Sequence, residues 1–226
     1  MTGYAVAVLL GFLAGLLVRS RLRDAPSLPG DQRWPLLAAV VLGGAAGAYL
    51  FELPADVFGW AWRPTGAEPI GGRTVLGGIL GGWLAVEVVK RWLGIRIPTG
   101  DGVAAPLAAA LAIGRLGCVA AGCCAGAACD PSAWYAVDGR FPAAAAEAGF
   151  HALALLVLLV ADRRGWARGR RLYAYLIAYG AVRFLLEVGR ANPPVLAGLT
   201  WYQVLALLVL ALGCWRWSAA GRSVPG

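Results

Sequence analysis

Seven nearly charge-free runs of residues dominate this chain of 226 residues. They cover residues 3–18, 35–53, 74–89, 103–122, 143–161, 172–188 and 199–215. A helix that crosses a bilayer needs about 20 apolar residues, with a lower limit near 17. Charged residues make up only 14% of the chain, whereas soluble domains carry about 25%. The pattern predicts an all-α integral membrane protein with about seven transmembrane helices, forming a single polytopic domain over residues 1–226.

The basic residues predict the orientation of these helices. Fourteen of the 20 Lys and Arg residues fall in loops or tails of one parity, whereas four fall in loops of the other parity. Cytoplasmic loops carry the excess of Lys and Arg in membrane proteins, so we expect the N-terminus outside and the C-terminus in the cytoplasm. The net charge of +8 also attracts membrane lipids. Because no soluble domain presents a basic face, we expect no nucleic-acid partner.

Two arginines lie well inside the predicted spans, Arg115 in the run 103–122 and Arg183 in the run 172–188. A charge at membrane depth is costly and marks a functional site by default. A guanidinium stays charged and donates two parallel hydrogen bonds to a phosphate group, and membranes supply phosphate as phospholipid headgroups. The pattern therefore favours a lipid-phosphate site. The alternative is structural: Arg183 pairs with Glu187, and Arg115 bonds backbone carbonyl groups.

Other polar side chains accompany the two arginines. Tyr179, Arg183 and Glu187 follow one another at intervals of four residues, so they share one helix face. Glu147 lies near the start of its span, and Arg190 follows the outer end of the sixth span. We predict that Arg190 binds the lipid phosphate with the two arginines, and the buried positions of the other residues make them candidates for a functional site.

Glycines recur with small-xxx-small spacing in the second and third spans, for example at Gly43, Gly47, Gly77 and Gly81. In lipid, such glycines let helix backbones approach closely. Gly77 and its neighbour Gly78 also leave backbone N–H groups accessible to a lipid headgroup. Both interpretations remain open from the sequence, and close packing is the favoured one.

The cysteines of the run Cys118-x4-Cys123-Cys124, with Cys129 beyond it, permit three interpretations. A structural zinc site prefers paired Cys-x2–4-Cys units or histidine, and this spacing is irregular. A disulfide from Cys123 or Cys124 to Cys129 is compatible with the outside. Small apolar packing residues are the favoured interpretation, so we expect no metal and no cofactor. His151 is expected to be a packed or interfacial residue, and its position four residues after Glu147 allows a hydrogen bond to that carboxylate.

Several motifs resemble one known family over nearly the whole chain. They are GRLGCVAAGCCAG (114–126), YLIAYGAVRFLLEVGR (175–190), GGRTVLGGILGG (71–82), RFPAAAAE (140–147), TWYQVLAL (200–207) and YAVAVLLGF (4–12). In residue types, order and topology they are similar to the prolipoprotein diacylglyceryl transferase family, seven-span enzymes of the bacterial inner membrane. The resemblance implies a multi-pass protein of that membrane.

The resemblance also implies an activity. The family transfers the diacylglyceryl group of phosphatidylglycerol to the thiol of a prolipoprotein cysteine, and glycerol phosphate leaves. Its partners here would be phosphatidylglycerol, membrane lipids and the prolipoprotein signal peptide. Arg115 and Arg183 match the arginines that hold the phosphate. Four further residues match positions that orient groups or handle protons: Tyr4, Glu147, Tyr179 and Glu187.

The chain departs from the family pattern at several of these positions. Leu76 stands where the family has its catalytic histidine, and Phe141 stands where it has a second one. The segment between the fourth and fifth spans, residues 123–142, is short for the family. Two alternatives to the family reaction therefore stay open: a transferase with the same donor and a non-lipoprotein acceptor, and a non-catalytic phospholipid-binding membrane protein.

Overall fold

The computed structural model describes residues 2–24, 28–62, 71–124 and 126–221. Within these ranges the chain is all-α apart from one small hairpin, as predicted. The elements are α1 (Thr2–Arg21), α2 (Gly30–Leu50), α3 (Leu53–Phe58), α4 (Val75–Trp92), α5 (Asp101–Ala120), α6 (Ala143–Arg164), α7 (Arg171–Leu186), the 3-10 helix η1 (Glu187–Gly189), β1 (Pro194–Leu196), β2 (Leu199–Thr200) and α8 (Trp201–Gly221). The strands β1 and β2 pair antiparallel.

Every one of the predicted apolar runs forms a helix. Among the described residues, five helical segments are long and apolar enough to cross a membrane. They are Gly30–Phe58, Asp101–Ala120, Ala143–Arg164, Arg171–Gly189 and Trp201–Ala220. The remaining two runs form α1 and α4, and α4 carries three charges near its end, at Glu87, Lys90 and Arg91. The count of seven spans and the orientation of the termini stay predictions.

The described chain divides into two compact units. The first unit comprises Met1–Pro26, Pro98–Ala191 and Leu210–Gly226, and the second comprises Ser27–Ile97 and Asn192–Val209. The first unit therefore holds α1, α5, α6 and α7 with the end of α8. The second holds α2, α3, α4, the hairpin and the start of α8. A single membrane domain over the whole chain stays a prediction.

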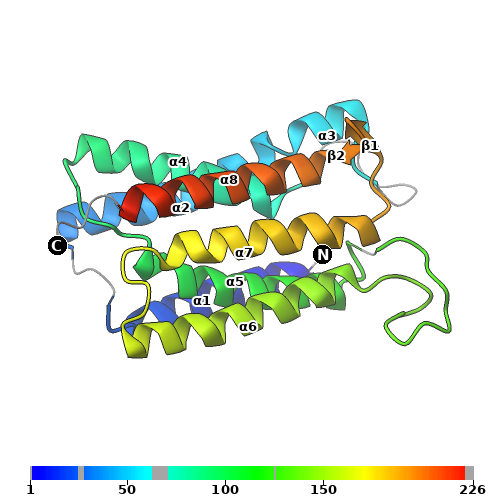
Figure 1. Cartoon of the computed structure of the whole chain (residues 1–226), viewed down its shortest axis with the longest axis horizontal. Helices are drawn as coiled ribbons and strands as arrows, with labels where there is room; N and C mark the ends of the chain where they lie inside the picture. Colours follow the sequence, from blue (N-terminus) through cyan, green and yellow to red (C-terminus); the bar gives the residue numbers. More distant parts are fainter. Residues whose placement is uncertain (1, 25–27, 63–70, 125, 222–226) are drawn as a thin grey trace. The chain divides into compact units, whose positions relative to one another are not determined.

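In the first unit α5 packs between α1 and α6, and α7 lies against both α5 and α6 (Figure 1). Small side chains allow these close approaches. The α5 alanines Ala104, Ala105 and Ala108 are buried, and a Cβ added at Gly11 of α1 would lie 2.8 Å from the carbonyl oxygen of Ala110. Because α5 is held so closely on two sides, the end of the helix that carries Arg115 is fixed against α6 and α7.

In the second unit the backbones of α2 and α4 meet at glycines. A Cβ at Gly47 would clash with the carbonyl oxygen of Gly77, and a Cβ at Gly81 would clash with that of Gly43. This is the small-xxx-small packing that the sequence favoured. The start of α8 is anchored in the same unit, where the Tyr202 hydroxyl donates to Glu52 Oε1 at 2.6 Å.

Candidate functional site

Three helix ends of the first unit meet around one carboxylate. Arg115 lies in the last two turns of α5, Glu147 in the first two turns of α6, and Arg183 in the last turn of α7. Glu187 begins η1, and Arg190 follows directly after it. Arg115, Glu147, Arg183 and Glu187 are all buried, and the Arg190 side chain is 12% exposed. We call these five residues the arginine cluster.

Glu147 is the hub of the arginine cluster. Its Oε1 atom accepts hydrogen bonds from Arg115 Nη2 at 3.2 Å and from the Tyr179 hydroxyl at 3.1 Å. Its Oε2 atom accepts a hydrogen bond from Arg190 Nη2 at 3.2 Å. Arg183 Nε lies 3.3 Å from Oε1. One carboxylate therefore orients three guanidinium groups that come from three different segments of the chain.

The contacts agree with the structural alternative for Arg183 in part and differ from it for Arg115. Arg183 donates to Glu187 through Nη1, as the structural alternative expected, but it also contacts Glu147. Arg115 pairs with the Glu147 carboxylate, an acidic partner that the sequence did not identify. The site residues predicted from α5, α6 and α7 are thus brought together.

The arginine cluster carries more positive charge than its own carboxylates balance. Three guanidinium groups face two carboxylates, which leaves one positive charge in excess when all are ionised. The Nε atoms of Arg115 and Arg190 are buried and make no hydrogen bond to the described part of the protein, although Arg115 Nε lies 3.0 Å from Glu147 Oε2. Buried donors without an acceptor are costly. Because Arg115 Nε is paired with Glu147, the groups available to an anion from outside are the Nε–H of Arg190 and the one excess charge.

Three predicted site residues are not among the arginine cluster as described. Tyr4 is part of α1, and its side chain lies outside what the structure describes. Gly77 and Gly78 belong to the second unit, where Gly77 packs against the backbone of Gly47. Their predicted role in binding a lipid headgroup stays a prediction.

His151 is fully buried one helical turn after Glu147, as expected of a packed residue. Its Nδ1 atom shares a hydrogen bond of 2.8 Å with the Tyr175 hydroxyl. Its Nε2 atom has no hydrogen-bond partner in the described chain. The hydrogen bond to Glu147 that the sequence allowed is not formed: the ring bonds the phenol of Tyr175 on α7 instead.

The chain turns sharply after α5 and brings three cysteines together. The sulfur atoms of Cys118, Cys123 and Cys124 all lie within 4.8 Å of one another. All five cysteines of the chain are free thiols, so no disulfide joins Cys129 to this group. Hydrogen bonds from Cys118 and Cys123, with the nearby charges of Arg115 and Arg190, hold the pKa of the Cys124 thiol below its usual range.

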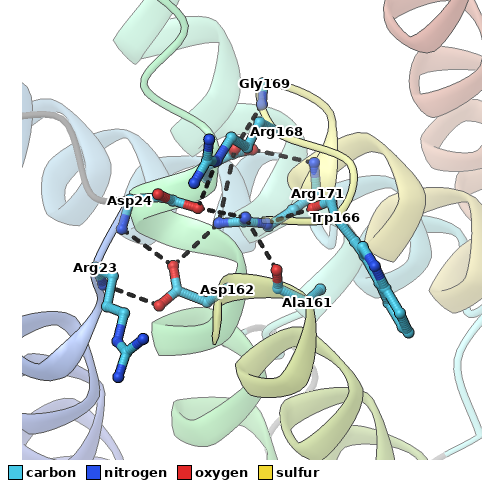
Figure 2. Close-up of polar contacts among 9 residues, drawn as sticks. Arg23, Asp24, Ala161, Asp162, Trp166, Arg168, Gly169 and Arg171 are labelled. Carbon is cyan, nitrogen blue, oxygen red and sulfur yellow. Dashed lines mark hydrogen bonds and ion pairs between the residues drawn. The ribbon is translucent and has the colours of Figure 1, made fainter. Parts of the chain in front are cut away.

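A second charged cluster of the first unit was not predicted (Figure 2). Arg171, at the start of α7, lies among three aspartates. It donates to Asp162 Oδ1 at 3.0 Å and to Asp24 Oδ2 at 2.6 Å, and it lies 4.0 Å from Asp101 Oδ2. Arg168 adds a hydrogen bond of 3.0 Å to Asp24. We call these five residues the aspartate cluster.

Backbone groups complete the aspartate cluster. Asp162 accepts hydrogen bonds from the N–H groups of Arg23 and Asp24, and the carbonyl oxygens of Ala161 and Trp166 accept from Arg171. The cluster thus fastens the end of α1 and the start of α7 to the end of α6. A sequence signal existed for it: Asp24 and Asp162 adjoin the most basic loops of the chain, where an acidic residue has a partner at hand.

Comparison with known proteins agrees with this architecture. The family model of the prolipoprotein diacylglyceryl transferases matches residues 1–219. Phosphatidylglycerol–prolipoprotein diacylglyceryl transferases of three bacteria are similar to the chain. That of Clostridium tetani is 25% identical over 93% of this chain and 90% of its own length. That of Methylibium petroleiphilum is 31% identical over 81% and 74%, and that of Paracidovorax citrulli is 30% identical over 89% and 84%.

The match begins one residue before α1 and ends in the last turn of α8, so it includes every helix that contributes to the arginine cluster. Two of the relatives are at least 30% identical over most of both chains. The chain therefore belongs to the prolipoprotein diacylglyceryl transferase family, whose members are transferases of lipoprotein biosynthesis.

Proposed function

We propose that this protein transfers the diacylglyceryl group of phosphatidylglycerol to a thiol acceptor and releases glycerol phosphate. The acceptor would be the cysteine of a prolipoprotein, presented with its signal peptide at the inner membrane of a bacterium. Membership of the family and the names of the relatives support the donor and the acceptor. The five apolar helical segments support a membrane location.

The single observation that carries the proposal is the positive excess of the arginine cluster. A phosphodiester needs positive charge and N–H donors at membrane depth, where neither water nor mobile ions supply them. Arg190 keeps a buried Nε–H that makes no hydrogen bond in the described chain, and Arg115 Nε is paired with Glu147 Oε2 at 3.0 Å. The planar guanidinium group of an arginine donates hydrogen bonds to phosphate oxygens and remains charged throughout.

The reaction would then proceed by displacement at carbon. The acceptor sulfur attacks the glyceryl carbon of the lipid, the carbon–oxygen bond to phosphate breaks, and the bonding electron pair stays on the phosphate oxygen. Arg115, Arg183 and Arg190 would stabilise the charge that develops on the departing phosphate. Glu147 and Glu187 would hold the guanidinium groups in place, because each carboxylate contacts at least two arginines.

The remaining predicted residues would have supporting roles. Tyr179 would orient the hub carboxylate through its hydrogen bond to Glu147, and Tyr4 would orient groups or handle protons. Gly77 would offer its backbone N–H to a lipid headgroup, whereas the N–H of Gly78 donates to the carbonyl oxygen of Thr74 at 3.0 Å.

One observation favours a second candidate function. Leu76, at the position of the family's catalytic histidine, is 1% exposed and carries no titratable group. The thiol proton must therefore leave by another route, or the acceptor must differ from a prolipoprotein. A transferase with a non-lipoprotein acceptor would keep the arginine cluster and the donor unchanged. A phospholipid-binding protein without turnover would keep them as well.

The test uses the full chain in vesicles that contain labelled phosphatidylglycerol, with and without a peptide that carries a lipobox cysteine. We expect release of glycerol phosphate and a diacylglyceryl thioether on the peptide. Arg115→Ala and Arg183→Ala should each lower the rate by about 10²–10³-fold, the cost of removing one donor to a developing oxyanion. Arg163→Ala, at an exposed position at the end of α6, is the matched control and should leave the rate unchanged.

Three other outcomes would each contradict part of the proposal. Release of glycerol phosphate with no modified peptide would replace the prolipoprotein with another acceptor. Arginine-dependent binding of phosphatidylglycerol without any release would leave a lipid-binding protein. Equal rates in all variants would remove the arginine cluster from the reaction.

A further inference from the structure

The turn that follows α5 folds two cysteines back over a third. The backbone N–H of Cys123 donates to the carbonyl oxygen of Cys118 at 3.1 Å. Gly122 and Cys124 have φ angles of 63° and 59°, the left-handed conformation that a residue with a side chain rarely adopts. As a result the three sulfur atoms lie within 4.8 Å of one another. We call Cys118, Cys123 and Cys124 the thiol cluster.

Apolar packing does not account for the thiol cluster. Cys118 is buried, but Cys124 is only half-buried and Cys123 is exposed. A cysteine that serves as a small apolar residue belongs in the core, and two of these three do not lie there. The arrangement therefore presents three sulfur ligands around one point, with one side open.

The spacing suits one thiophilic metal ion. Zinc binds thiolate sulfur at about 2.3 Å, so the ligands of a tetrahedral ion lie about 3.8 Å apart. The thiol cluster needs to contract by at most about 1 Å to reach that spacing. Zinc sites that take part in reactions have three protein ligands and keep the fourth position open. Three cysteines with one open side provide that set.

The charges around the thiol cluster favour the same ligand set. Zinc with three thiolates carries one net negative charge. Arg115 and Arg190 interact electrostatically with the Cys124 sulfur, and Arg115 precedes Cys118 by three residues on α5. The guanidinium groups of Arg115 and Arg190 therefore place positive charge near the sulfur atoms, which favours a negatively charged zinc–thiolate centre there.

We propose that Cys118, Cys123 and Cys124 bind one zinc ion through three thiolates and leave its fourth position to the acceptor thiol. This inference rests on the function proposed above. It departs from the sequence-based expectation of no metal, because the spacing Cys-x4-Cys-Cys does not reveal that the turn after α5 folds back. It also supplies what Leu76 lacks, a means of removing the thiol proton.

The step balances without any oxidant or reductant. The acceptor thiol coordinates zinc and releases its proton to water, since a coordinated thiol is deprotonated. The bound sulfur then forms a bond to the glyceryl carbon, the carbon–oxygen bond breaks, and glycerol phosphate takes the electron pair. The product is a thioether, a weaker ligand than a thiolate, so it leaves the metal and frees the fourth position.

The first test measures metal binding without any turnover. The full chain in detergent is treated with a chelator, reloaded with zinc and analysed for zinc per chain. We expect one zinc for the native chain and for Cys129→Ser, and at least tenfold weaker binding for Cys118→Ser, Cys123→Ser and Cys124→Ser. Because Cys123 is exposed, its replacement cannot be dismissed as a folding defect. A native chain that retains no zinc, or a triple variant that retains it, overturns the proposal.

The second test asks whether the fourth position takes a thiol. Cobalt(II) replaces zinc as a spectroscopic probe, and a lipobox peptide is added in its cysteine and serine forms. The cysteine peptide should change the cobalt–thiolate absorption, and the serine peptide should not. Identical spectra for the two peptides would overturn the role of the metal as a thiol site.

The two proposals can fail separately. If zinc and thiol bind but no glycerol phosphate is released, the proposed transferase function fails and the metal site stands. If the metal-free chain releases glycerol phosphate at the rate of the zinc-loaded chain, the metal step fails and the transferase function stands. Zinc-dependent release that is lost in Cys123→Ser and kept in Cys129→Ser would support both.

Discussion

The arginine cluster and the aspartate cluster of the first unit are built from the same kinds of side chain in opposite proportion. In the first, three guanidinium groups face two carboxylates. In the second, three carboxylates face Arg171 and Arg168. Along α5 they are separated by the distance from Asp101 to Arg115, about 21 Å for a straight helix. The helix α5 thus contributes one residue to each cluster.

The two clusters differ in how fully their polar groups are hydrogen-bonded within the protein. In the aspartate cluster the Nε, Nη1 and Nη2 atoms of Arg171 all donate to protein oxygens, and backbone N–H groups satisfy Asp101 and Asp162. In the arginine cluster the Nε–H of Arg190 makes no hydrogen bond in the described chain, and one positive charge is left over after the two carboxylates are counted. A cluster that satisfies its own groups holds helices together. A cluster with an N–H donor that makes no hydrogen bond within the protein is suited to bind an anion.

The largest expected effect is on stability, in the aspartate cluster. Arg171→Ala leaves three carboxylates close together without their central cation. Removing one partner of a buried ion pair costs about 3–5 kcal/mol, so we expect a loss of that order in the free energy of unfolding. Unfolding of the detergent-solubilised protein by heat or denaturant measures it.

The matched control for this prediction is Arg168→Ala. The Arg168 side chain is 69% exposed although it pairs with Asp24, and exposed pairs contribute at most about 1 kcal/mol. Equal losses for Arg171→Ala and Arg168→Ala would show that burial does not distinguish the two arginines, and the aspartate cluster would lose its structural role.

The next effect is on activity, in the arginine cluster. Arg115→Lys keeps the positive charge but loses the planar fork that contacts Glu147 and would contact a phosphate. We expect the release of glycerol phosphate to fall by roughly 100-fold, with a smaller change in unfolding than Arg171→Ala causes. Arg163→Lys, on α6 and exposed, should change neither quantity. A lysine variant with full activity would reduce the role of Arg115 to its charge alone.

The helices were predictable because each is a long apolar run that ends at charged or turn-forming residues. Arg183 and Glu187 were predictable as a pair, since both lie on one helix at a spacing of four residues. The position of Arg115 next to Glu147 was not, because it depends on how α5 packs against α6. The residue pattern within one helix identifies candidate site residues. Their partners on other helices are determined by how the helices pack.

Two clusters were missed for different physical reasons. The basic residues of the aspartate cluster look like the ordinary charges that set membrane topology, and only the fold shows that Arg171 is buried among three carboxylates. The thiol cluster has no recognisable spacing, because a left-handed residue at Cys124 decides where its sulfurs lie. Backbone conformation in a turn of this kind is specified by tertiary contacts more than by local sequence.

A smaller effect on activity separates two neighbouring tyrosines of α7. Tyr179→Phe removes the hydroxyl that donates to Glu147 and keeps the ring. A hydrogen bond to a charged group contributes about 1.5–3 kcal/mol, so we expect the rate of release to fall at least tenfold. Tyr175→Phe is the control, because its hydroxyl bonds His151 and makes no contact with the arginine cluster. If Tyr175→Phe lowers the rate equally, the orientation of Glu147 is not what Tyr179 provides.

The smallest expected effect is the pH dependence of the aspartate cluster. Hydrogen bonds from Arg171 and Arg168 hold the pKa of Asp24 below its ordinary value of 3.8. The unfolded chain therefore binds a proton at Asp24 more readily than the folded chain does. The stabilisation that Asp24 contributes is complete above pH 3.8 and is lost as the pH falls through the lower pKa of the folded protein.

Asp24→Asn isolates this contribution. At pH 7 the variant should unfold at a lower temperature than the native chain, and the difference should shrink as the pH falls below 3.8, because the native carboxyl is then neutralised as well. Asp31→Asn, at an exposed position in the first turn of α2, should track the native chain throughout. A difference that stays constant down to the acid limit would mean that Asp24 acts through packing. The aspartate cluster would then stabilise the helix ends by shape, and its contrast in charge with the arginine cluster would have no consequence for stability.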